Sequence, residues 1–128
     1  GGLEGIAIAP VSDTEARFFV ANQGTSGQPG DAPALLQLAI PTEPGAAAAI
    51  SAYTPVNQAD VSDLHYFREG DVLLTLSDAD NVLAQYTRDG ALVTACPVPG
   101  ANQEGITLTP DGTVWLGQNN AVLVRFTV

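Results

Sequence analysis

The sequence predicts an all-β protein built from repeated antiparallel units. Its apolar residues come in short runs rich in valine, leucine, isoleucine, threonine and aromatic residues, each with the length of a strand. Turn-forming residues separate the runs. Asp89-Gly90 and Asp111-Gly112 are strong signals for tight turns, because glycine tolerates a positive φ. No window carries a helical stripe of apolar residues, so the whole chain favours sheets.

The expected strands follow one another with few interruptions. They are Gly5–Ala9, Arg17–Ala21, Leu35–Ile40, Val61–Phe67, Val72–Leu76, Val82–Tyr86, Leu92–Cys96, Gly105–Thr109, Thr113–Gly117 and Val122–Val128. The segment Ala46–Tyr53 has room for a further strand, although the alanines in it also suit a short helical turn. Cys96 is the only cysteine, and its apolar neighbours predict a small buried hydrophobic residue rather than a nucleophile.

The strands form a repeat. Gly2–Pro10 closely matches Asn102–Pro110, and Asp60–Tyr66 occupies the same place in a middle unit. Self-similarity at a spacing of about 40–58 residues, with about four strands in each unit, is typical of propeller blades. We therefore expect residues 1–128 to form a partial β-propeller of about three four-stranded antiparallel blades, at approximately 1–57, 58–100 and 101–128. The last blade is incomplete, and the chain alone should expose blade edges and one open hydrophobic flank.

The composition excludes several classes of function. Fourteen acidic residues face four arginines and no lysine, which gives a net charge of −10. Nucleic-acid binding is excluded because it needs cationic side chains that displace counterions. Direct membrane insertion is not expected either, because no apolar run approaches the length of a span. The chain lacks methionine, so we expect that it does not begin at a natural start codon.

Three groups of motifs resemble the SdiA-regulated β-propeller family and, more distantly, the phytase-like and esterase-like propellers. The motifs are Leu3–Ala7, then Asp60–Leu64 with Val72–Asp78, and then Gln103–Ile106 with Pro110–Gly112 and Val124–Phe126. The resemblance implies a propeller of about twice this length, of which this chain is the C-terminal half. The expected partner is therefore the missing N-terminal half or, in a homo-oligomer, a second copy. Family members are typically exported or membrane-tethered bacterial proteins, which implies a secreted, periplasmic or cell-surface location.

Glu4, Asp63 and Glu104 are the first candidates for a functional site. Each lies at or beside the start of an innermost strand, so in a propeller the three carboxylates converge near the axis. Converging carboxylates repel one another unless a cation compensates, and calcium is the divalent ion that suits several oxygen ligands. The alternative is structural: each acid accepts backbone N–H groups from the next blade and fixes the blade register. No fingerprint for an organic cofactor is present.

His65 is the only histidine and a weak candidate for a catalytic residue. It lies two residues after Asp63, so the two side chains share a strand face, and a carboxylate-paired imidazole can act as a general base or a metal ligand. The alternative is a packed histidine with one satisfied hydrogen bond.

These residues leave three functions open. The first is an extracytoplasmic binding or scaffold module, with a divalent cation near the axis. The second is a metal-dependent hydrolase of phosphate or carboxylic esters, and the third is a purely structural half-propeller that self-assembles.

Overall fold

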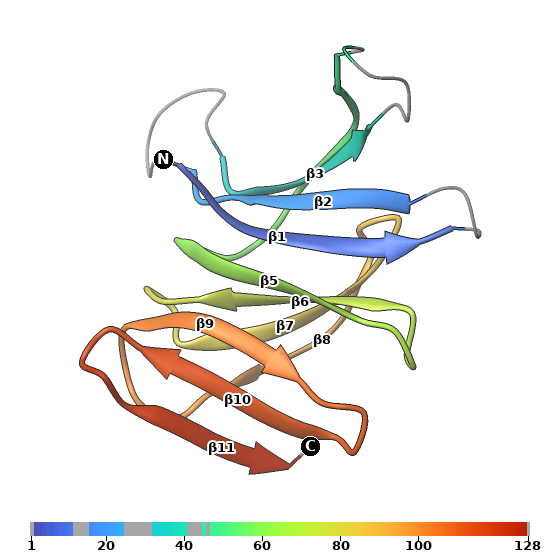
Figure 1. The fold of residues 1–128 in the computed structure, drawn as a ribbon. Helices are drawn as coiled ribbons and strands as arrows, with labels where there is room; N and C mark the ends of the chain where they lie inside the picture. The colour runs from blue at the N-terminus through green and yellow to red at the C-terminus, as the bar shows by residue number, and fades with distance from the viewer. Residues whose placement is uncertain (1, 12–15, 25–31, 41–44, 46, 128) are drawn as a thin grey trace.

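The computed structural model describes residues 2–11, 16–24, 32–40, 45 and 47–127, and it confirms the all-β prediction (Figure 1). The described residues form three antiparallel sheets and contain no helix, hence none that is long and apolar enough to cross a membrane. Sheet 1 contains β1 (Leu3–Pro10), β2 (Ala16–Asn22), β3 (Ala34–Ala39) and β4 (Ala49–Pro55). Sheet 2 contains β5 (Val61–Phe67), β6 (Val72–Ser77), β7 (Val82–Thr87) and β8 (Leu92–Pro97). Sheet 3 contains β9 (Gln103–Leu108), β10 (Thr113–Gln118) and β11 (Leu123–Thr127).

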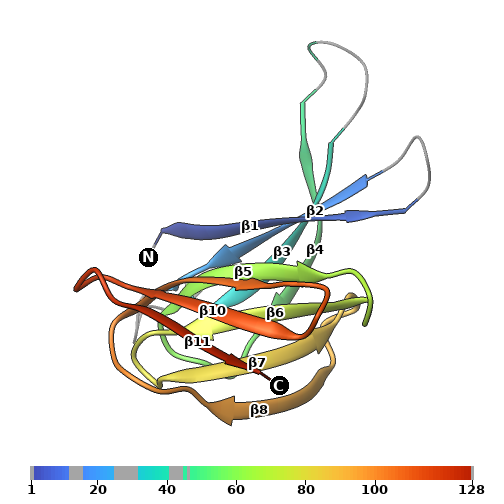
Figure 2. The same ribbon diagram turned by 60° about the horizontal axis from the view of Figure 1, so that its bottom comes forward.

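Each sheet is a simple meander, in which every strand pairs with its neighbours in sequence. The first strands of the three sheets, β1, β5 and β9, lie next to one another, and we call them the inner strands (Figures 1 and 2). Sheet 2 therefore lies between sheets 1 and 3. Across the described residues the three sheets do not close into a barrel.

All three sheets share one irregularity near the start of the inner strand. The register shifts between Leu3 and Gly5 in sheet 1, and between Val61 and Asp63 in sheet 2. It shifts again in sheet 3, where Gln103 and then Gly105 pair with β10. A bulge of this kind inserts one residue and re-aims its neighbours. Because the shifts coincide, Gly5, Asp63 and Gly105 occupy equivalent positions in the three sheets.

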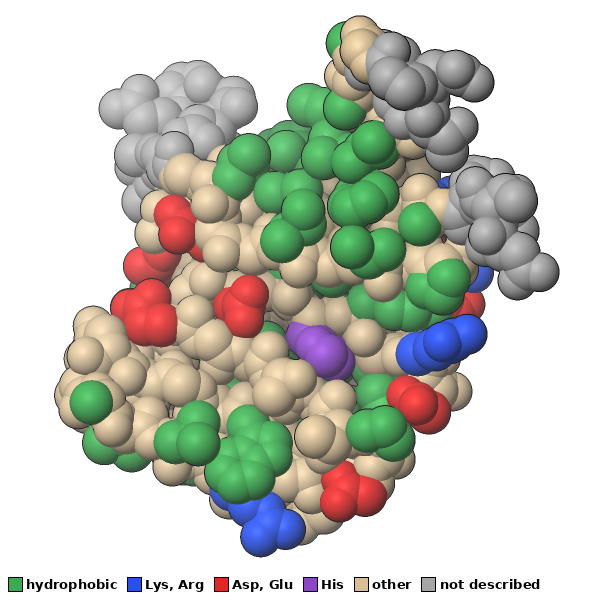
Figure 3. All heavy atoms as spheres, viewed as in Figure 1, with side chains coloured by type: hydrophobic (Ala, Val, Ile, Leu, Met, Phe, Trp, Pro, Cys, Tyr) green, Lys and Arg blue, Asp and Glu red, His purple; other side chains and the backbone are tan. Residues whose placement is uncertain are grey.

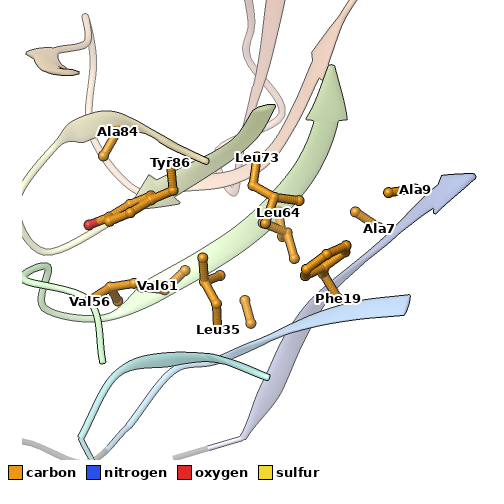
Figure 4. Close-up of a cluster of buried hydrophobic side chains, with 11 residues drawn as sticks. Ala7, Ala9, Phe19, Leu35, Val56, Val61, Leu64, Leu73, Ala84 and Tyr86 are labelled. Carbon is orange, nitrogen blue, oxygen red and sulfur yellow. The ribbon is translucent and has the colours of Figure 1, made fainter. Parts of the chain in front are cut away.

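The core consists of two clusters, one on each face of sheet 2. The first packs sheet 1 against sheet 2 and contains Phe19 and Leu35 opposite Leu64 and Leu73 (Figure 4). The second packs sheet 2 against sheet 3 through Val72, Leu74, Leu76, Leu83, Val98, Ile106, Val114 and Leu116. Sheet 2 thus buries both faces, which explains why all six residues of β6 are buried.

Most local predictions agree with the structure. Gly90 and Gly112 have the positive φ values of 86° and 81° that their predicted turns require. The alanine-rich segment forms a strand, Ala49–Pro55, rather than a helical turn; Ala46 lies outside the described residues. The last predicted strand is β11, and Val128 also lies outside them.

The prediction of a buried Cys96 is wrong. Cys96 is an exposed free cysteine on β8, the outermost strand of sheet 2, and every residue of that strand is exposed. An apolar run is normally a signal of burial, but an outer strand reaches beyond the faces that the neighbouring sheets cover.

Leu76→Ala is expected to destabilise the fold strongly. Leu76 is fully buried in the second cluster, and removing its side chain leaves a cavity that costs about 2–5 kcal/mol. Urea unfolding measures this loss. The control is Leu92→Ala on β8, where the leucine is 55% exposed and the free energy of unfolding should change by less than about 0.5 kcal/mol. Equal losses in the two variants would contradict this assignment of the core.

Candidate functional site

Asp63, one of the predicted site residues, links two sheets. Its Oδ2 accepts a hydrogen bond of 2.7 Å from the backbone N–H of Ile106 in β9. The Thr109 N–H bonds the Thr113 carbonyl, so the odd-numbered residues of β9 turn their backbone groups toward β10. The N–H of Ile106 therefore points to the free edge of β9. Asp63 satisfies this donor, which no strand of sheet 3 reaches.

The same carboxylate also lies against β1. A Cβ atom placed on Gly5 would stand 2.8 Å from Oδ1 of Asp63 and still closer to the backbone nitrogen of Leu64. A side chain at position 5 would therefore collide with β5. On the other side, Oδ2 would lie 3.8 Å from a Cβ atom on Gly105. The close approach of β5 therefore requires glycine at position 5, whereas a Cβ atom on Gly105 would only be in ordinary van der Waals contact with the aspartate.

Burial raises the pKa of Asp63 above its usual value of 3.8. Hydrogen bonds from the backbone N–H groups of Ile106 and Leu64 act in the opposite direction, and so does the nearby His65. The desolvation of the carboxylate outweighs these contacts. Asp63 is therefore a partly buried acid whose carboxylate accepts hydrogen bonds from two backbone N–H groups.

His65 faces the same inner strand as Asp63. Burial lowers the pKa of His65 below its usual 6.5, while the Asp63 carboxylate, a hydrogen bond with the Leu108 backbone and Glu69 oppose this shift. The imidazole is thus held neutral near physiological pH, with Asp63 two positions before it. Both side chains bond the backbone of β9, at Ile106 and at Leu108.

Glu4 and Glu104 do not occupy positions equivalent to Asp63. The register aligns both glutamates with Ser62, one position before the aspartate. Both are exposed, and neither side chain has a hydrogen bond or ion pair with another described residue. No group of three or more His, Cys, Asp or Glu side chains that could hold a metal ion occurs in the described part of the chain. The calcium site at Glu4, Asp63 and Glu104 stays a prediction.

A second acidic feature lies at one end of the contact between sheets 1 and 2. An open hollow of about 870 Å³ is lined by Gln23, Asn57, Asp60 and Asp80, among other residues. The amide of Gln23 donates to Asp60, and Asp80 accepts a hydrogen bond of 2.7 Å from the N–H of Ala59. The Asp78–Asn81 segment, which contributes Asp80 to the lining of the hollow, is a turn. Each carboxylate therefore already ties the loop that carries it to another segment of the chain.

An exposed apolar surface lies on the face of sheet 1 that points away from sheet 2, which we call the open face of sheet 1. Alternation along β1 buries Ala7 and Ala9 on one side and exposes the larger apolar residues on the other. Figure 3 shows hydrophobic side chains gathered over this part of the molecule. The exposed apolar residues on this face are Leu3, Ile6, Ile8, Ile50 and Tyr53. The sequence predicts an open hydrophobic flank, but not that β1 itself forms it.

The comparisons do not place the chain in a family. No family model matches it, and no curated protein matches it significantly. The resemblance to SdiA-regulated propellers therefore stays a prediction from the three motifs.

Asp63→Asn is expected to change the pH dependence of stability. Because the folded pKa of Asp63 is raised, the folded protein holds this proton after the unfolded chain has lost it. The contribution of Asp63 to stability is therefore largest at low pH and falls as the pH rises from 3.8 through the raised folded pKa. Asparagine keeps an oxygen for the Ile106 N–H but carries no charge. We would measure the free energy of unfolding in urea from acid to neutral pH. Relative to the wild type, the free energy of unfolding of the asparagine variant should rise as the pH increases through this range.

Asp63→Ala is the matched control for the hydrogen bond. It leaves the Ile106 N–H without its acceptor, which costs about 1–3 kcal/mol at a buried site. A parallel pH profile for wild type and Asp63→Asn, or an alanine variant as stable as the asparagine variant, would contradict the described role.

Gly5→Ala tests the close approach of β1 and β5. The added methyl group would collide with the backbone of Leu64, so we expect a loss of about 1–3 kcal/mol in the free energy of unfolding. Gly117→Ala is the control, because a Cβ atom there meets no atom within 4 Å. Thermal unfolding of both variants measures the difference. A Gly5→Ala protein as stable as the control would show that the two strands can separate freely.

Proposed function

We propose that the chain is a run of consecutive β-propeller blades that works as a binding or scaffold module. Three features support the blades: each sheet is a meander, the inner strands are adjacent, and the same bulge recurs in each sheet. Antiparallel four-stranded sheets arranged in this way are the repeating unit of propellers. In this interpretation Leu3–Pro55, Val61–Pro97 and Gln103–Thr127 are successive blades.

The open face of sheet 1 is the observation that carries the binding function. Ile6 is 63% exposed, whereas its equivalents Leu64 and Ile106 are 3% and 8% exposed, because the preceding sheet covers each of them. Leu3 is likewise exposed where Val61 is buried. The exposed fractions of the equivalent residues in sheets 2 and 3 thus indicate how far a partner would bury this face. An apolar area of this kind on a folded protein marks an interaction surface.

The contacts of Asp63 support a structural use of the predicted site residues. The carboxylate accepts an N–H group from the neighbouring sheet, which matches the alternative in which an acid fixes the blade register. An axial calcium ion remains part of the proposal, supported by the predicted convergence of Glu4, Asp63 and Glu104. A secreted, periplasmic or cell-surface location also remains part of it, supported by the sequence resemblance.

A scaffold module is expected to show no hydrolase activity. We would assay the wild type with p-nitrophenyl acetate and p-nitrophenyl phosphate, in the presence of calcium, magnesium or zinc. The rate should not exceed that of Glu104→Gln, because Glu104 is exposed and bonds none of the described residues. Asp89→Asn is the control, since Asp89 is an exposed acid in the turn after β7. A turnover that Glu104→Gln abolishes and Asp89→Asn retains would overturn the scaffold function and favour a metal-dependent ester hydrolase.

A further inference from the structure

We infer that the open face of sheet 1 binds sheet 3 of a second copy of this chain, in a head-to-tail contact that repeats the packing of sheet 1 on sheet 2. The inference rests on the proposed scaffold function and names the partner. It depends on two faces of one molecule. The face that is built to be covered carries residues whose equivalents are buried by a preceding sheet, and the face that is built to cover carries residues whose equivalents pack on a following sheet.

The face that is built to be covered is defined by the inner strands. The register makes Ile8 equivalent to Tyr66 and Leu108. Tyr66 packs on the first core cluster and Leu108 on the second, each against the sheet before it. Ile8 is 54% exposed, as no described sheet covers this side of sheet 1. Leu3, Ile6 and Ile8 on β1 are therefore equivalent to residues that, in β5 and β9, pack against the preceding sheet.

The face that is built to cover is the open face of sheet 3, which points away from sheet 2. Leu123 pairs with Gly117 in β11 and β10, just as Leu35 pairs with Ala21 and Leu83 pairs with Leu76. Leu35 and Leu83 are 3% and 6% exposed because each packs on the following sheet. Leu123 is 64% exposed.

Trp115 extends the same comparison on the second strand. Its register partner is Thr107, and the equivalent residues in sheets 1 and 2 are Phe19 and Leu74. Both of those side chains are buried between sheets, whereas Trp115 is half-buried and has the guanidinium of Arg125 over its ring at 5.6 Å from the centroid. Sheet 3 thus carries a large apolar residue, Leu123 or Trp115, at two of the positions that sheets 1 and 2 use to cover the next sheet, whereas Gly117 stands where sheet 2 has Leu76.

A second copy fits because one chain supplies both faces. Sheet 3 of one molecule on sheet 1 of the other makes one contact, and the reverse pairing makes an identical second contact, so that two copies close on themselves. The net charge of −10 on each copy opposes association, and salt screens such repulsion between exposed charges. The contact is therefore expected to strengthen as the salt concentration rises, as apolar association between two anions should.

The test is the mass of the full chain in solution, measured by sedimentation over a range of concentrations and at low and high salt. We expect a species of twice 13.2 kDa that dissociates on dilution and persists longer at high salt. Ile6→Arg and Leu123→Arg should each give a folded monomer, because both residues are exposed within one molecule. Leu92→Arg is the control on the exposed strand β8 and should dimerise like the wild type.

Mixing the two arginine variants gives the sharpest result. In a head-to-tail pair of one Ile6→Arg and one Leu123→Arg molecule, both arginines fall in the same contact and the other contact is unchanged. A heterodimer should therefore form although neither variant dimerises alone. A dimeric Leu123→Arg protein would indicate a contact between two copies of sheet 1 and would overturn the inference, and so would a mixture that stays monomeric.

A wild-type chain that is monomeric at every concentration would also overturn it, since the open face then belongs to a different partner. The hydrolase assay is independent of this outcome. Turnover abolished in Glu104→Gln with an intact dimer would remove the scaffold function and leave the contact in place. A monomer without turnover would remove only the second copy as partner.

Discussion

The close approach of β1 and β5 is the constraint on which the arrangement of the sheets depends. Gly5 brings the backbone of β1 to a distance from Leu64 that leaves no room for any side chain. Ala7 and Ala9 continue the same narrow face along β1. Small residues on the inner strand allow the larger side chains of β2 and β3, Phe19 and Leu35, to reach the core of sheet 2. The inner strands therefore fix the distance between sheets 1 and 2, and the side chains of β2 and β3 fill the space between them.

Asp63 works within this spacing under opposing demands. Its partly buried position favours the neutral acid, whereas the N–H groups of Ile106 and Leu64 favour the carboxylate. The balance remains on the side of desolvation, so the charge is held at a cost. The hydrogen bond from Ile106, which ties the free edge of β9 to sheet 2, offsets only part of that cost. Sheet 1 has no such acid at the equivalent position, and there a glycine allows close contact instead.

The sequence predicts much of the fold because strands and turns are local. Alternating apolar residues and Asp-Gly turns place most strands, and the matching motifs at Gly2–Pro10 and Asn102–Pro110 reveal the repeat. The exposure of Cys96 could not be predicted from its neighbours in sequence, because it depends on how far β8 extends beyond the next sheet.

The site was harder to predict than the strands. Glu4, Asp63 and Glu104 all lie near the start of their strands, but the bulge occurs at the same place in all three sheets, so the register aligns both glutamates with Ser62, one position before the aspartate. The glycines that follow both glutamates are the signal in the sequence, because they mark where a neighbouring backbone, or the Asp63 side chain, comes close.

The position of sheet 2 between its neighbours makes local stability uneven along the chain. Sheet 2 must lose two packed faces to open, whereas sheet 1 and sheet 3 each lose one. In stacked repeats of this kind, stability is close to a sum over neighbouring contacts, so the outermost units fray first. A molecule bound to the open face of sheet 1 would turn an outermost unit into an inner one. The local unfolding of β1 to β4 is therefore thermodynamically linked to binding at that face. Slower proteolysis or amide exchange in this sheet would report binding even if the structure did not change.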